Sequence, residues 1–214
     1  MKILGLDASI NSTGIVCATL DDNELMITGI NYCGFTSVKR NRSANVILYG
    51  KFKSDMAKYL WMRNKIFEIT GPVDYVAFED YAYGGSGLVL NIAEYTALLK
   101  EIYYLNGSKI RLYDIKGIKK FATGDGNADK IRMNDEFNKW NFNSNMDISK
   151  LPDYKSPKLD IIDAYYIMRL LQTELQLRRG LIQLRNMAEN RIWAFNRVTK
   201  HAKENVLTRE FIER

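Results

Sequence analysis

The chain is 214 residues long and carries 31 Lys and Arg against 25 Asp and Glu, for a formal net charge of +6. This length suits one sizeable domain with a small appendage, and 46% hydrophobic with 26% charged residues argues against a mainly disordered chain. The single histidine, His201, and two cysteines without metal-ligand spacing, Cys17 and Cys33, argue against histidine triads and the usual zinc sites. We therefore expect reduced thiols, metal chemistry through carboxylates only, and an anionic partner such as nucleic acid.

The sequence also gives an expectation for the compartment. No apolar run has the length of a membrane span, and the N-terminus enters a strand-like run without a signal peptide. We expect a cytoplasmic protein with no membrane partner. The richness in Lys and Asn hints at an AT-rich genome, so for a viral protein the compartment would be the host cytoplasm.

The first third of the chain reads as strands. Lys2 to Ser9 and Thr13 to Leu20 are short apolar runs around a turn, and Leu25 to Phe35 follows the turn signal at Asp21. Three antiparallel strands are the natural interpretation.

A long helix and a fourth strand are expected next. Ser43 to Thr70 is free of proline, has apolar residues at helical spacing and ends at Gly71. Val73 to Glu79 is a strand with an acidic last residue, and Asp80 to Gly87 is a loop rich in Gly and Tyr.

Helices dominate the remainder of the chain. The pattern predicts a helix at Leu88 to Leu105, a fifth strand at Lys109 to Tyr113, and helices at Ile115 to Ala122 and Ala128 to Trp140. Strands first and covering helices later predict an α/β domain with a five-stranded mixed sheet flanked by helices.

After a polar loop, an unusually apolar helix begins near Ser156, the expected N-cap, with Pro157 in the first helical position. It contains two acids, Asp160 and Asp163, three residues apart on one side. From Gln172 onward a helical apolar stripe is surrounded by Arg and Lys. We expect a domain at residues 1–172 and a basic helical C-terminal extension at 173–214.

Four carboxylates could meet at one point of this fold. Asp7 and Glu79 end strands that can be neighbours, and Asp160 and Asp163 lie on a helix that can pack across those strand ends. Such a cluster needs cations, and hard oxygen ligands suit Mg²⁺ or Mn²⁺. Two ions about 4 Å apart would serve phosphodiester hydrolysis.

Ordinary explanations exist for three of these acids taken singly. Asp7 could be a turn former, Glu79 a solvated strand end, and Asp160 a partner of the helix dipole. Asp163 is the exception, because it lies a turn further into a helix that should be buried.

These residues resemble the RuvC family of Holliday junction resolvases in the RNase H-like superfamily. The resemblance is carried by Gly5 to Ser9, Thr13-Gly14, Glu79 and Asp160 to Ala164 in that order. In addition, residues 118–130 are similar to the family's Lys-containing helix and its Gly-x-Gly-x-Ala-x-Lys loop. The resemblance covers roughly residues 2–172 and implies an RNase H-like fold, with Asp7, Glu79, Asp160 and Asp163 as ligands of Mg²⁺.

The resemblance also implies roles for basic and aromatic residues. Lys130 matches a catalytic position near the scissile phosphate, and Lys119, followed by Lys120, matches the basic helix that approaches DNA; either lysine could instead be an ordinary solvated charge. The family has a Phe where this chain has Ala82, so Tyr81 and Tyr83 could stack on an unpaired base or simply pack the loop down. This departure leaves the cleavage sequence preference open.

The main hypothesis is a Mg²⁺-dependent endonuclease, with Mn²⁺ as a substitute, that cuts four-way DNA junctions as a homodimer. One alternative is a broader nuclease acting on flaps, forks and Y-junctions. Another is a DNA-binding module without catalysis. A sugar kinase or actin-like ATPase shares the Asp-x-Ser opening, but no second phosphate loop or adenosine motif is found.

Overall fold

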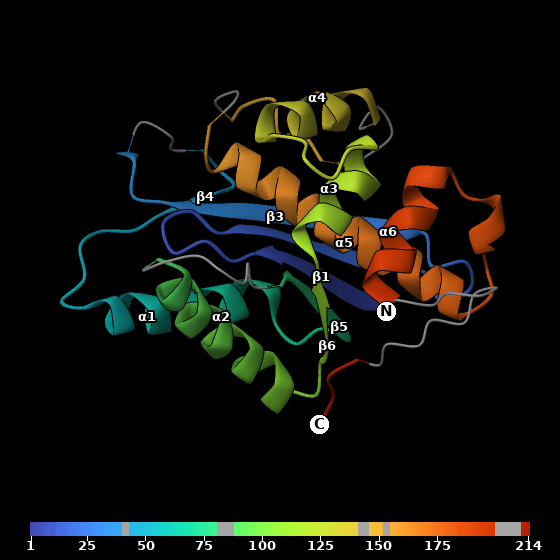
Figure 1. Cartoon of the computed structure of the whole chain (residues 1–214). Coiled ribbons are helices and arrows are strands. Elements are labelled where there is room, and N and C mark those ends of the chain that lie inside the picture. Colours follow the sequence, from blue (N-terminus) through green and yellow to red (C-terminus); the bar gives the residue numbers. More distant parts are fainter. Residues whose placement is uncertain (40–42, 81–87, 141–145, 152–154, 200–210) are drawn as a thin grey trace.

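A computed structural model describes residues 1–39, 43–80, 88–140, 146–151, 155–199 and 211–214 (Figure 1). Tyr81 and Tyr83 lie outside these residues. The elements, in chain order, are β1 (Lys2–Asp7), β2 (Gly14–Leu20), β3 (Ile27–Thr36), β4 (Val46–Leu48), α1 (Asp55–Thr70), β5 (Tyr75–Glu79), α2 (Leu88–Leu105), β6 (Lys109–Tyr113), α3 (Ile115–Thr123), α4 (Lys130–Trp140), α5 (Lys158–Arg178) and α6 (Glu189–Thr199).

The strands form one mixed sheet in the order β4-β3-β2-β1-β5-β6. The pairs β1/β2 and β2/β3 are antiparallel, as the short turns of the N-terminal segment predicted. Strand β5 returns parallel to β1, and β6 parallel to β5. Because β1 and β5 run side by side in the middle of the sheet, their carboxyl ends lie together.

The expectation of five strands and a helix from Ser43 was wrong in one segment. Val46–Leu48 forms a sixth strand, parallel to β3, and α1 begins only at Asp55. The helix starts there because the Ser54 hydroxyl accepts a hydrogen bond from the amide of Ala57. Val46 and Leu48, which match the helical spacing, therefore belong to an edge strand of the sheet.

Helices cover both faces of the sheet (Figure 1). α1 and α2 pack on one face over a core that includes Leu4, Leu6 and Phe78. α5 packs on the other face, with α3, α4 and α6 outside it, over a core that includes Ile161 and Ile162. This two-sided burial explains why the central strands read as continuous apolar runs.

Helix α5 is buried on almost every side, as its apolar sequence predicted. The expected N-cap was wrong, since Pro157 occupies the cap position without a side-chain hydrogen bond and the helix begins at Lys158. At its other end, Glu174 accepts hydrogen bonds from Arg111 and Tyr113 on β6 and from Arg178. These buried contacts fix the helix against the sheet.

The C-terminal part returns to the domain. α5 continues past residue 172 to Arg178, Gly180 adopts a positive φ of 71°, and α6 packs on α3 through Phe195 and Phe121. Near the end of the chain, Ile212 pairs with Ile110 at the edge of β6. Within the described residues, no helix is both long and apolar enough to cross a membrane.

Candidate active site

Three carboxylates meet where β1 ends beneath the first turns of α5. One oxygen atom from each of Asp7, Asp160 and Asp163 lies within 4.8 Å of the other two. We call these three residues the acidic cluster. The short turn after β1 fixes Asp7, and the i, i+3 spacing places Asp160 and Asp163 on the adjacent side of the helix.

Glu79 lies nearby but outside the acidic cluster. It is the last residue of β5, and the parallel pairing of Leu6 with Phe78 brings it to the same sheet edge as Asp7. Burial and, to a smaller extent, the negative charge of Asp163 together raise the pKa of Glu79 to about 7. The sheet therefore brings the fourth expected acid within electrostatic reach of Asp7 and Asp163.

Burial and mutual repulsion dominate the electrostatics of the acidic cluster. Burial raises the pKa of Asp7 well above its usual range, and the charges of Asp163 and Asp160 add to this rise. Burial also raises the pKa of Asp163. Such a site favours a cation, because a positive charge offsets both the desolvation and the repulsion.

Lys130 at the start of α4 supplies one positive charge. Its Nζ atom lies 2.7 Å from Oδ1 of Asp160 and 3.1 Å from Oδ2 of Asp163, and its side chain is 50% exposed. Burial alone would lower the pKa of Lys130, but the charges of Asp163, Asp7 and Asp160 raise it well above its usual range. One ammonium cannot neutralise every acid here, so negative charge remains that divalent ions could offset.

Ser12 is a site residue that the sequence reasoning missed. Its hydroxyl donates a 2.5 Å hydrogen bond to Oδ2 of Asp160, while Lys130 binds the other oxygen of the same carboxylate. Ser12 is buried in the turn between β1 and β2. The polar run before Gly14 was the available signal, but it read as an ordinary turn.

The other predicted residues lie in different surroundings. Lys119 on α3 is close enough for its charge to lower the pKa of Glu79 and of Asp163. Lys120 points toward α6, with Nζ 5.1 Å from the ring centroid of Trp193. DNA contacts by Lys119 and Lys120 remain predictions.

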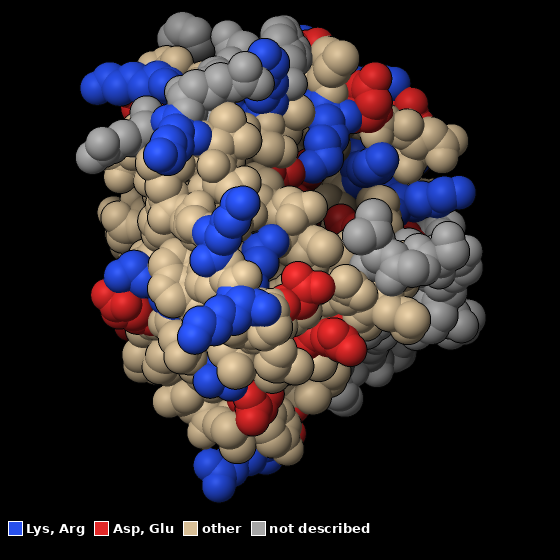
Figure 2. Space-filling model, turned by 90° about the vertical axis from the view of Figure 1, so that its left-hand side faces the viewer, with Lys and Arg blue, Asp and Glu red and all other residues tan. Residues whose placement is uncertain are grey.

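The charge distribution around the site is visible on the surface. Figure 2 shows Lys and Arg side chains scattered over one face, together with exposed acidic groups, and acidic atoms recessed in a hollow that Lys and Arg border. An anion approaching this hollow meets positive charge before it meets the recessed acids.

Comparisons with solved structures identify the fold. RuvC of Thermus thermophilus matches with a TM-score of 0.54 at 14% identity, over 84% of this chain and 96% of that one. Its complex with a Holliday junction substrate matches equally, over 85% and 97%. A yeast mitochondrial Holliday junction resolvase matches with a TM-score of 0.52 at 15% identity, over 83% of both chains.

The chain therefore has a RuvC-like, mixed α/β fold, as the sequence motifs predicted. No protein-family model matches the sequence, and no curated protein matches it.

Proposed function

We propose that this protein is a metal-dependent, structure-selective DNA endonuclease that cuts four-way junctions. The observation that carries the proposal is the acidic cluster, in which three carboxylates from β1 and α5 lie within 4.8 Å of one another. Its position at a strand end of a RuvC-like fold supports the same activity, because one solved structure with this fold is in complex with a Holliday junction substrate and another is named a Holliday junction resolvase.

The chemistry of the donor set fits a hard divalent cation. Asp7, Glu79, Asp160 and Asp163 offer only carboxylate oxygens, which suit Mg²⁺ or, as a substitute, Mn²⁺. A metal ion held by these residues would supply Lewis-acid activation of a water and charge stabilisation for an in-line displacement.

The protein's own groups would do the remaining work. Ser12 holds Asp160 in one orientation through its hydrogen bond. Lys130 lies among the acids and is half exposed, so its ammonium can turn toward an arriving phosphate and offset the negative charge that develops in the reaction. Lys119 adds positive charge beside Glu79.

A two-fold arrangement would suit a four-way junction. We propose a homodimer that places two such sites on opposite strands, since a symmetric substrate is matched by a symmetric enzyme.

The test is cleavage of mobile and fixed four-way junctions with Mg²⁺, with Mn²⁺ and with EDTA. We expect cutting only with a divalent ion, and we expect Asp163→Asn to retain junction binding while losing cleavage. Asp55→Asn, at an exposed acid of α1, is the matched control and should cut at the wild-type rate. Full cleavage by Asp163→Asn would refute the assignment.

The same assay separates the alternatives. Comparable rates on forks, flaps and four-way junctions would indicate a broader branched-DNA nuclease. Junction binding without cleavage by any divalent ion, and without Mg²⁺ binding in a calorimetric titration, would indicate a DNA-binding module.

A further inference from the structure

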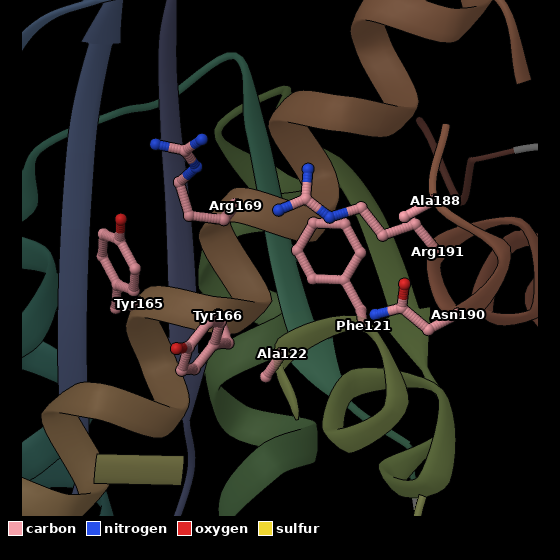
Figure 3. A pocket seen from close by; sticks show the side chains of 8 residues that line it. All are labelled: Phe121, Ala122, Tyr165, Tyr166, Arg169, Ala188, Asn190 and Arg191. Atoms are coloured by element: carbon pink, nitrogen blue, oxygen red, sulfur yellow. The ribbon is translucent and has the colours of Figure 1, made fainter. Parts of the chain in front are cut away.

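A pocket beside the candidate active site is built from three helices. It has a volume of about 300 Å³ and lies between α3, α5 and α6 (Figure 3). Phe121 comes from α3, Tyr166 and Arg169 from α5, and Arg191 from α6. We call it the α3/α5/α6 pocket.

Two arginines mark this pocket, and both lie against aromatic rings. The guanidinium carbon of Arg169 is 5.9 Å from the ring centroid of Tyr165, and that of Arg191 is 5.1 Å from the ring centroid of Phe121. Figure 3 shows both guanidinium groups on the same side of the pocket. Stacking of this kind holds the planar group in place while its N–H donors stay available.

Neither Arg169 nor Arg191 forms an ion pair with any residue that the structure describes. By contrast, the buried Arg111 is paired with Glu174. Burial and the positive charge of Arg169 lower the pKa of Arg191, although a guanidinium stays charged in proteins. Two close cations that have no counter-charge among the described residues repel each other, so an anion between them would be stabilised.

The neighbouring surface extends the site. A second hollow of about 660 Å³ adjoins the pocket and shares Arg169, Ala188 and Arg191 with it. Tyr166 is 6% exposed, and its hydroxyl has no hydrogen-bond partner in the described structure. The two arginines therefore lie where two hollows join, along a groove and not in a closed cavity.

We propose that Arg169 and Arg191 together bind a backbone phosphate of a DNA strand that runs along this groove. The inference rests on the proposed function in taking DNA as the ligand. The planar guanidinium fork matches phosphate oxygens, and two forks can grip one phosphate from two helices. The α3/α5/α6 pocket is thus a phosphate anchor outside the catalytic centre.

The position of the pocket relative to the acidic cluster supports this ligand. Arg169 follows Asp163 by six residues on α5, a separation of roughly 9 Å along the helix axis. α3 contributes both Phe121 to the pocket and Lys119 to the candidate active site. Because α3 borders both sites, a strand that leaves the acidic cluster past α3 would meet the arginines within a few nucleotides.

The anchor also gives a role to the C-terminal extension. Arg191 lies beyond residues 2–172, to which the sequence resemblance is confined, and α6 holds it against Phe121 on α3. The extension would thus set how firmly one DNA arm is held.

The first experiment compares Arg169→Gln, Arg191→Gln and the double variant with Arg185→Gln. Arg185 is an exposed arginine of the same C-terminal segment that lines neither hollow and donates a hydrogen bond to Gln183, so its variant removes the same charge away from the pocket. Four-way-junction affinity is measured in EDTA over a range of salt concentrations. Each pocket variant should lose about ten-fold in affinity, and the salt slope of the double variant should fall by about 0.9, the value for one phosphate contact.

The second experiment leaves the protein unchanged. Single methylphosphonates, which are neutral, are placed along one arm of the junction and tested with the wild-type chain. One position should weaken binding by about the same factor as the double variant, and the double variant should lose nothing more at that position. The methylphosphonate measurement on the wild-type chain tests the inference even if a variant fails to fold.

The outcomes separate this inference from the proposed function. If the wild type cuts junctions with Mg²⁺ while the pocket variants keep the wild-type affinity and salt slope, the phosphate anchor is refuted and the nuclease stands. If the slope changes but no divalent ion supports cutting, the anchor stands and the nuclease is refuted. If inorganic phosphate raises the melting temperature of the wild type alone while DNA binding is unaffected, the ligand is a free phosphate and the DNA anchor is refuted.

Discussion

Gly14 of β2 lies directly beneath the backbone of Asp160. A Cβ atom at Gly14 would be 1.9 Å from the carbonyl oxygen of Asp160, and one at Gly5 would be 2.3 Å from that of Ala164. Helix α5 therefore packs on the backbone of the two central strands with no side chain between them. This close approach is what allows carboxylates on α5 to reach Asp7.

Substitution of Gly14 should consequently displace the site as well as destabilise the fold. Gly14→Ala cannot be accommodated by a rotamer change, because the atoms in the way are backbone atoms. We expect a loss of about 1–3 kcal/mol in the free energy of unfolding, the usual cost of overpacking a core, and weaker Mg²⁺ binding. Gly29→Ala is the matched control, since its Cβ would meet only Thr19 at 4.0 Å. Equal urea midpoints for the two variants would contradict this interpretation.

Lys130 should stabilise the metal-free protein and compete with the metal for the acidic cluster. Lys130→Ala leaves Asp160 and Asp163 without their ammonium partner. We expect a loss of about 1–2 kcal/mol in EDTA, less than for a fully buried pair because the ammonium is half exposed.

The melting temperature of Lys130→Ala should accordingly rise more steeply with Mg²⁺ than that of the wild type, and single-turnover cutting should slow. Lys139→Ala is the control, because Lys139 lies on the same helix and pairs with Glu136 at a largely exposed position. An identical Mg²⁺ response in Lys130→Ala and wild type would argue against competition at the site.

Glu174 should be among the most sensitive positions of the fold. It is fully buried and accepts hydrogen bonds from Arg111, Tyr113 and Arg178. Glu174→Gln leaves the buried Arg111 without a counter-charge, which costs about 3–5 kcal/mol.

Urea denaturation measures this cost. The control is Glu101→Gln, which removes the ion pair between Arg63 and a half-exposed carboxylate, at a cost of no more than about 1 kcal/mol. A near-neutral Glu174→Gln would mean that the buried network contributes little to fixing α5.

The two thiols should be unreactive in the native protein and should make it sensitive to alkali. Burial raises the pKa of Cys17 to about 11 and of Cys33 to about 12, from an ordinary value of 9.0. Between pH 9 and 11 the unfolded chain loses these protons while the folded chain keeps them, so stability falls as the pH rises.

Each thiol contributes at most about 1.4 kcal/mol per pH unit in this window. Labelling with a disulfide reagent at pH 8 should proceed only at the rate of unfolding, and denaturant midpoints at pH 8, 9 and 10 should decrease. Cys17→Ala/Cys33→Ala should remove this part of the decrease. Rapid labelling of the native chain would contradict the burial of the thiols.

The sequence by itself determined most of the elements and the chemistry of the site. The strands β1, β2, β5 and β6 and the helices α2 and α5 follow from apolar periodicity, which is a property of neighbours along the chain. The sequence indicated the acids as a candidate site because Asp163, a carboxylate deep in an apolar helix, needs a partner. The helix predicted from Ser43 was wrong over residues 43–54, because apolar spacing does not show where a helix begins. The Ser54 cap marks that position.

Only the tertiary structure decided what these residues meet. Ser12 on Asp160, Lys130 between two acids and Arg191 on Phe121 join positions 30 to 148 residues apart. No local pattern specifies such contacts, since they depend on how closely α5 packs on the sheet and on where the chain returns after Gly180. The sequence predicts which charges need a partner, but the packing of distant elements selects the partner.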